Sequence, residues 1–140
     1  MPTDPEALAA QGWQPIQPDS FSRALGPLWM MRGERPAMGF IATEAQTNGH
    51  MKTVHGAALM TLADLALGYG VSIAAGTPNS ATIQLNLQFV AAPQIGDFVV
   101  CYPEVIRVTR DVTFVRATIQ VGDRTVANAD GIWKFLKPKA

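Results

Sequence analysis

The sequence predicts an α+β fold, in which one long central helix is wrapped by a curled antiparallel β-sheet. A proline-free run rich in Ala, Leu and Met, from Gly56 to Ala75, predicts the helix. Apolar and polar residues alternate in the segments 82–89 and 115–121, which predicts strands. The helix is apolar nearly all round, so it has to be enclosed on most sides. Long strands twist and curl, so the sheet is expected to enclose the helix.

Length and charge limit the class of protein. The chain has 140 residues, which fits a single domain spanning residues 1–140 with a core that needs no disulfide. Lys and Arg number 11 and Asp and Glu number 11, so the net charge is zero and no nucleic-acid partner is expected. Hydrophobic residues make up 48% and charged residues 16%, which predicts that another subunit covers part of the apolar surface.

The N-terminus and the single cysteine predict a cytoplasmic location. Cys101 cannot form an internal disulfide, and residues 1–6 lack the basic and apolar regions of a signal peptide. The segment Val54–Ala75 approaches membrane-spanning length, but it contains Asp64. A mid-span Asp costs about 2.5–3.5 kcal/mol on insertion, so we expect a soluble helix and no membrane partner.

The elements before the helix are expected to be short. Six of the ten prolines fall before residue 37, so residues 1–36 are expected to form an irregular segment packed on the domain, with a short helix and short strands. Strands are predicted at Leu28–Arg32 and Ala37–Thr43. The polar stretch Glu44–Thr53 then reads as a loop that leads to His55.

Four consecutive antiparallel strands are predicted after the helix. In the first, Ile83, Leu85, Leu87 and Phe89 alternate with polar residues, which indicates one buried and one wetter face. The later strands are expected at Phe98–Thr109, Val112–Val121 and Arg124–Leu136. Gly122 and Asp123 have the composition of a two-residue hairpin turn.

The start of the helix is a candidate binding site for an anion or a polarised carbonyl. The first N–H groups of a helix lack partners within it and lie at the positive end of its dipole. Gly56 and Ala57 occupy these positions, directly after His55. The alternative is that His55 and Gly56 simply shape the junction between loop and helix.

Asp64 is the second candidate. It is the only charged residue between Lys52 and Arg107 apart from Asp97 and Glu104, and it lies in a helix predicted to be buried. A buried carboxylate is costly, so it should face a polar cavity or a partner group. Hydrogen bonding to Thr or Ser side chains in a structural role is the alternative.

The spacing of the two candidates bears on the oligomeric state. Eight residues separate Gly56 from Asp64, which is about 12 Å along a helix axis. Both cannot contact one carbonyl within one chain. If both act at one site, two helices must meet antiparallel across a two-fold axis, which predicts a homodimer.

Three motifs resemble those of hotdog-fold acyl-CoA thioesterases of the phenylacetate-degradation type: His55-Gly56-Ala57, Leu62-Ala63-Asp64 and Gln84-Leu85-Asn86-Leu87. The resemblance covers Gly39 to Phe135. It implies the hotdog fold, an acyl-CoA substrate, no cofactor, and a homodimer or dimer of dimers with sites shared between subunits. It also implies that Asp64 is the nucleophile or general base, that the Gly56 N–H forms the oxyanion hole, and that Thr82 assists.

Several positions depart from the family pattern. Ala57 replaces the second motif glycine, and Lys52 stands where a glycine is usual three residues before the motif histidine. The motif asparagine is displaced, because Asn48 lies one residue before its usual position. Asn48 is expected to reach the leaving-group side of the site through a changed loop, and the alternative is that His50 takes this role. The segment between Asn86 and Pro93 has one extra residue, which indicates a bulge.

Other residues have weaker assignments. Arg110 and Lys134 are candidates to bind the CoA phosphates, or are simply solvated cations. No metal site is expected, because His50 and His55 are five residues apart and no Cys or Glu completes a set. Cys101 and the three tryptophans are expected in the core or an interface, and Gly68 and Gly70 are interpreted as packing positions.

Two other functions remain open. The first is a non-catalytic protein that binds acyl-CoA or another acyl ligand on the same fold, since a fold does not fix a function. The second is a dehydratase acting on acyl thioesters, in which His55 would serve as the base. Detection of thiol release separates hydrolysis from binding.

Overall fold

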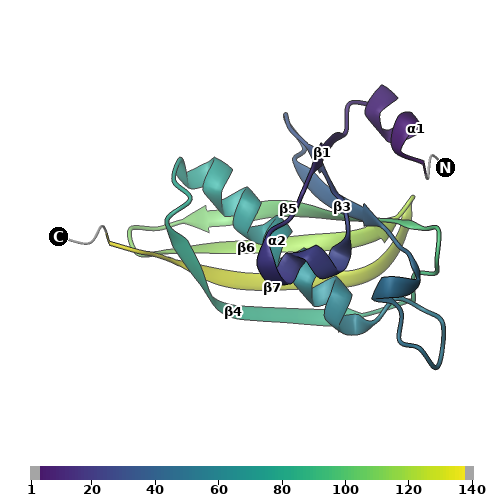
Figure 1. Cartoon of the computed structure of the whole chain (residues 1–140). Helices are drawn as coiled ribbons and strands as arrows, with labels where there is room; N and C mark the ends of the chain where they lie inside the picture. The colour runs from purple at the N-terminus through teal and green to yellow at the C-terminus, as the bar shows by residue number, and fades with distance from the viewer. Residues whose placement is uncertain (1–3, 138–140) are drawn as a thin grey trace.

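A computed structural model describes residues 4–137 of the chain. The helices are α1 (Pro5–Ala10) and α2 (Gly56–Ala75), with 3-10 helices η1 (Ser20–Leu25) and η2 (Glu44–Gln46). The strands are β1 (Gln14–Ile16), β2 (Leu28–Met31), β3 (Ala37–Ile41), β4 (Ser80–Phe89), β5 (Phe98–Val108), β6 (Val112–Val121) and β7 (Arg124–Phe135). The predicted α+β fold is confirmed, because α2 lies across one face of a seven-stranded antiparallel sheet (Figure 1).

The order of strands in the sheet differs from their order in the sequence. It runs β1-β2-β3-β5-β6-β7-β4, so the chain crosses from β4 at one edge to β5 in the middle. The predicted strands after the helix are therefore present, but β4 pairs with β7 and not with β5. Because no strand of residues 4–137 lies on its other side, β4 is an edge of the sheet in the single chain.

Capping residues define both ends of α2. His55 is the N-cap and accepts a hydrogen bond from the N–H of Ala57, while Gly76 ends the helix in the left-handed conformation, with φ of 71°. Gly70 lets the helix approach β5, because a Cβ there would lie 2.8 Å from Cβ of Pro103. A Cβ at Gly68 would lie 3.4 Å from the Trp133 indole nitrogen, so both glycines are packing positions as predicted.

The expectation that the helix is enclosed on most sides is wrong for the single chain. Leu59, Leu62 and Leu67 are fully buried against the sheet, but Met60 on the opposite side is exposed. Asp64 is also exposed, so it is not the buried carboxylate that the sequence suggested. The physical reason is that a single sheet covers only one side of a helix. By length and composition, α2 is the one helix in residues 4–137 that could span a membrane, and it is this partly buried central helix.

A smaller apolar cluster lies on the other face of the sheet. Phe98 and Val100 point there, because they alternate along β5 with the core residues Val99 and Cys101. Trp13 packs edge-on against Phe98 with ring centroids 4.9 Å apart, and Trp29 joins the same cluster. Trp133 is buried under α2, so the core positions expected for the three tryptophans are confirmed.

Two irregularities in β4 change which face of the sheet its side chains point to. The N–H groups of Val90 and Ala91 both donate to the Val126 carbonyl, which is the bulge indicated between Asn86 and Pro93. A second irregularity, between Thr82 and Gln84, was not predicted. It interrupts the alternation, and Ile83 is consequently 57% exposed instead of lying on a buried face with Leu85.

Candidate active site

The first turn of α2 presents one unpaired amide. The Ala57 N–H donates to His55 Nδ1 at 2.9 Å, and the Ala58 N–H donates to the His55 carbonyl at 2.9 Å. Within residues 4–137, no hydrogen bond uses the N–H of Gly56. The Gly56 N–H is therefore available, at the positive end of the helix dipole, to a carbonyl or anion.

The backbone at Gly56 borders a shallow cavity. The cavity has a volume of about 270 Å³ and is lined by apolar residues: Val54, Gly56, Leu59, Phe89, Val90, Ala91 and Ala92. A Cβ on Gly56 would lie 3.3 Å from the ring of Phe89, so glycine leaves this approach to the backbone open. The arrangement suits a carbonyl group attached to an apolar chain.

Asp64 is held by Thr82 from the neighbouring strand. The Thr82 hydroxyl donates to Asp64 Oδ1 at 2.7 Å, and both residues are exposed. No other hydrogen bond in the described chain involves this carboxylate. A cavity of about 250 Å³ borders Asp64, with Phe21, Met60 and Leu65 among its lining residues. The carboxylate thus faces a groove with one oxygen oriented by a neighbour.

The single chain does not bring these two groups together. Gly56 and Asp64 are separated by about 12 Å along the helix. Strand β4 runs antiparallel to α2, since Thr82 bonds Asp64 while Phe89 lies against Gly56. The two groups therefore lie at different points along the same helix–strand pair.

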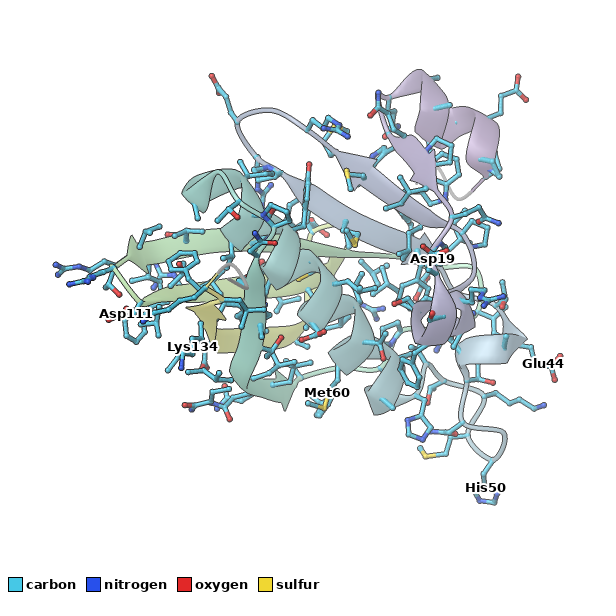
Figure 2. The ribbon with its side chains drawn as sticks, turned by 60° about the vertical axis from the view of Figure 1, so that its left-hand side comes forward. Asp19, Glu44, His50, Met60, Asp111 and Lys134 are labelled. Atoms are coloured by element: carbon cyan, nitrogen blue, oxygen red, sulfur yellow. The ribbon has the colours of Figure 1, made fainter. Side chains whose placement is uncertain are left out.

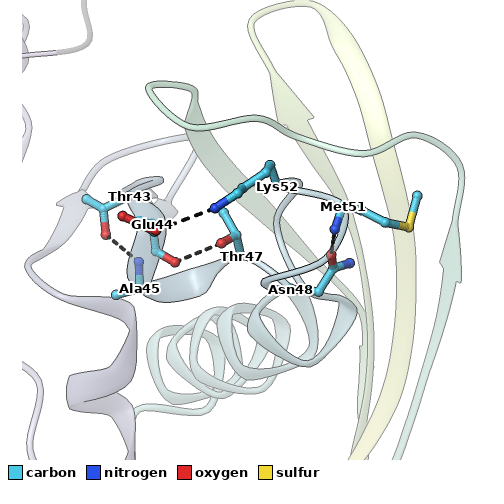
Figure 3. A network of polar contacts seen from close by, with 7 residues as sticks. All are labelled: Thr43, Glu44, Ala45, Thr47, Asn48, Met51 and Lys52. Atoms are coloured by element: carbon cyan, nitrogen blue, oxygen red, sulfur yellow. Dashed lines mark hydrogen bonds and ion pairs between the residues drawn. The ribbon is translucent and has the colours of Figure 1, made fainter.

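Asn48 stabilises its own loop. Its side-chain oxygen accepts the Met51 N–H at 2.7 Å (Figure 3). Its backbone carbonyl accepts the Lys52 N–H at 3.1 Å. Lys52 has φ of 61°, in the left-handed region that glycine adopts without strain, which explains why a glycine is usual at this position. Its ammonium group lies 3.6 Å from Glu44.

The remaining candidates lie on the periphery. His50 is at the exposed tip of its loop, while Lys134 lies at the opposite end of the molecule, near Asp111 (Figure 2). Lys134 pairs with Ala81 in the sheet, next to Thr82, the residue that bonds Asp64. Arg110 is exposed in the turn between β5 and β6, and neither cation has an ion pair within residues 4–137.

Cys101 is a core residue. Its side chain is fully buried between α2 and the sheet, and burial raises the pKa of its thiol to about 12. A protonated thiol without access to solvent is not a nucleophile. In the described part of the chain, no three His, Cys, Asp or Glu residues gather as a metal site would require.

Comparison with known families gives one match. The family model described as the thioesterase superfamily matches residues 51–128, which is more than half of the chain. A Pseudomonas aeruginosa protein named as a candidate esterase is 29% identical over 126 residues, covering 88% of this chain and 94% of the relative.

Solved structures with the same fold include three informative neighbours. Zebrafish thioesterase superfamily member 2 has a TM-score of 0.76, 18% identity, and coverage of 85% of this chain and 88% of that one. A mutant of the phenylacetic acid degradation protein PaaI from Thermus thermophilus has a TM-score of 0.74 and 19% identity. The match covers 84% of this chain and 100% of that one. A Bacillus halodurans protein solved with CoA has a TM-score of 0.68 and 20% identity. The match covers 79% of this chain and 74% of that one.

Proposed function

The chain belongs to the thioesterase superfamily, and we propose that it hydrolyses the thioester of an acyl-CoA to a carboxylic acid and CoA. The observation that carries this proposal is the Thr82-bound carboxylate of Asp64, which lies on the same helix as the unpaired N–H of Gly56. Similarity to the Bacillus halodurans protein solved with CoA supports CoA as the carrier.

We propose that the active site is shared between two chains in a homodimer. Two β4 edges paired antiparallel about their midpoints would place Thr82 and Asp64 of one chain near Phe89 and Gly56 of the other. The free edge of β4 and the exposed Ile83 on it support this pairing, since uncovered apolar edges favour association. Two such dimers could associate further into a dimer of dimers.

The mechanism follows from these groups. The thioester carbonyl accepts a hydrogen bond from the Gly56 N–H, which stabilises the oxyanion that forms during attack. Asp64 of the other chain removes a proton from water as the water oxygen attacks the carbonyl carbon. The C–S bond then breaks and CoA leaves as a thiolate, which takes up a proton. Direct attack by Asp64 would instead form an anhydride that water hydrolyses.

The other candidates take supporting roles in the proposal. His55 caps α2 by accepting the Ala57 N–H, which leaves Nε2 as the protonated nitrogen of the neutral ring and a donor toward substrate. Ala57 keeps the backbone close to the ligand. Arg110 and Lys134 would bind the CoA phosphates, and Asn48 or His50 would reach the leaving-group side. The chemistry needs no cofactor.

The orientation of His55 favours hydrolysis over dehydration. A dehydratase would need the ring to accept a proton from substrate, but Nδ1 already accepts the Ala57 N–H at 2.9 Å. The non-catalytic alternative keeps one observation in its favour, because the side-chain oxygen of Asn48 is bound within its own loop.

Thiol release from short-chain, medium-chain, long-chain and aryl acyl-CoAs tests the proposal. We expect turnover by the wild type and a loss of at least about 100-fold in Asp64→Asn, the range of general base catalysis. Asp130→Asn is the control, because Asp130 accepts a hydrogen bond from Asn86 at 3.1 Å and lines neither the cavity at Asp64 nor the cavity at Gly56. Full hydrolysis by Asp64→Asn would contradict the mechanism, and acyl-CoA binding without turnover by the wild type would favour the binding protein.

A further inference from the structure

Phe21 is an exposed aromatic residue beside the proposed active site. At 78% it has the largest exposed fraction among the large hydrophobic side chains of residues 4–137. It lies on η1, outside the segment 51–128 that matches the family. Its position beside the cavity that contains Asp64, rather than its exposure, makes it a candidate ligand contact.

The backbone that follows Phe21 is held by contacts with the core and with η2. Leu25, at the end of η1, is buried in the main core. The side chain of Gln46 donates to the Ala24 carbonyl at 3.0 Å and accepts the Thr43 N–H at 2.7 Å, which joins η1 to η2. At the other end, Ser20 has φ of 53°, a conformation few residues other than glycine adopt. In Figure 1, η1 lies in dark purple against the N-terminal half of α2.

Phe21 is common to two cavities along α2. The first, of about 250 Å³, contains Asp64, Met60 and Leu65. The second, of about 210 Å³, contains His55, Ala57 and Ala58 near the start of the helix. Thr61 is the other residue that lines both, and its hydroxyl is bound to the Ala57 carbonyl at 2.9 Å. The ring of Phe21 thus lies where the two cavities meet.

The chemistry of both cavities suits an acyl group. Six of the ten lining residues of the cavity at His55 and three of the six at Asp64 are apolar. Neither cavity is lined by Lys or Arg, whereas the phosphates of CoA require cations or amide donors. A group attached to a thioester at Asp64 passes Phe21 if it extends along α2 toward His55, because Phe21 lines both cavities. Each cavity is smaller than the roughly 300–1,000 Å³ of typical ligand sites, so one alone admits a small group.

We propose that Phe21 determines specificity by limiting the length of the acyl group. The acyl group occupies the cavity at Asp64, and the ring closes it off from the cavity at His55. Removal of the ring joins the two cavities into one longer groove. This inference rests on the proposed function for the identity of the ligand, but it concerns binding and not the bond-breaking step.

Binding of non-hydrolysable S-alkyl-CoA thioethers of increasing chain length, measured by titration calorimetry, tests the inference without turnover. For the wild type we expect affinity to rise with length and then to stop rising. For Phe21→Ala we expect the long-chain Kd to fall about tenfold, as roughly two more buried methylene groups would give, with little change for short chains. Phe114→Ala, which truncates a phenylalanine on strand β6, is the matched control.

Three results would overturn the proposal: an unchanged length profile in Phe21→Ala, an equal change in Phe114→Ala, or no binding of any thioether to the wild type. Circular dichroism and oligomeric state are compared first, and Phe21→Leu serves if Phe21→Ala fails to fold. Thioester hydrolysis is assayed separately. A length profile altered by Phe21→Ala without any hydrolysis would contradict the proposed function while supporting the role of Phe21.

Discussion

At the scale of single residues, His55 and Gly56 divide the capping of α2 between them. The imidazole satisfies the Ala57 N–H, and the Gly56 N–H stays unpaired in the described structure. A helix capped in this way keeps its stability and still presents one amide to a ligand. The residue before Gly56 also has an extended conformation, with φ of −64° and ψ of 139°.

This geometry allows the amide to be removed without disturbing the helix. Proline is favoured at the first helical position, and His55 already has the conformation that a residue before proline requires. We expect Gly56→Pro to lower kcat by about 10²–10³, the effect of losing one oxyanion donor.

Gly56→Ala is the matched control for this prediction. It adds a Cβ near the Phe89 ring but keeps the N–H, so we expect it to retain much more of the kcat of the wild type. Equal kcat values for the two variants, with unchanged thermal unfolding, would show that the amide does not stabilise the transition state.

The residues of the candidate site were predictable to different degrees. Asp64 and Thr82 were predicted as site residues because they match the spacing of the family motifs. The hydrogen bond from the Thr82 hydroxyl to Asp64 Oδ1, at 2.7 Å, agrees with a shared role. The exposure of Asp64 was not predictable, because the sequence shows that a helix is apolar but not which sides its sheet leaves open. Phe21 was missed since it lies in a short 3-10 helix without periodicity, and its only signal is an aromatic ring among polar neighbours.

At the scale of elements, close contact between α2 and β5 depends on Gly70. The position lies in the helix with no room for a side chain, because Pro103 would be 2.8 Å from a Cβ. Gly68 is on the same helix two residues earlier, and its nearest neighbour would be at 3.4 Å, an ordinary contact. A side chain therefore fits at Gly68 but not at Gly70, although both residues have the same helical backbone.

We expect Gly70→Ala to lower the free energy of unfolding by about 1–3 kcal/mol, through overpacking against Pro103. Gly68→Ala should leave stability unchanged or raise it by up to about 1 kcal/mol, because alanine favours the helix. Urea denaturation followed by circular dichroism measures both. A loss of equal size in the two variants would mean that helix geometry, and not the contact with β5, limits stability.

The elements themselves were largely predictable, and their arrangement was not. The helix Gly56–Ala75 and the later strands follow from local periodicity and turn residues. The position of β4 beside β7 depends on a long-range crossover that no local pattern encodes. The irregularity at Thr82–Gln84 likewise depends on pairing with β7, which explains why Ile83 was placed on the wrong face.

At the scale of the whole molecule, β4 and the open side of α2 form one uncovered surface. The surface carries Asp64, Thr82, Met60 and Ile83, all exposed in the single chain. The low charge content of the sequence predicts that a second subunit covers apolar surface. In the described chain, the uncovered surface of β4 and α2 is the candidate for this contact.

A heterodimer made of two inactive chains tests whether the site is shared. One chain carries Asp64→Asn and the other Gly56→Pro, and two affinity tags isolate the mixed dimer. If each site takes Gly56 from one chain and Asp64 from the other, one of its two sites is intact and about half of the wild-type kcat returns.

The reciprocal dimer makes the result decisive. A wild-type chain paired with a chain carrying both substitutions should be inactive, because each site then contains one altered residue. Activity in this dimer together with none in the first would place each site within a single chain. Light scattering confirms that both preparations have the oligomeric state of the wild type.

The burial of Cys101 has a consequence for redox chemistry. Burial raises the pKa of its thiol to about 12, so the thiol stays protonated near neutral pH, and the sheet and α2 shield it from solvent. Thiol–disulfide exchange requires an accessible thiolate. The chain's only cysteine is therefore not available for exchange with a disulfide of CoA, although the proposed reaction would release the CoA thiol at the protein surface.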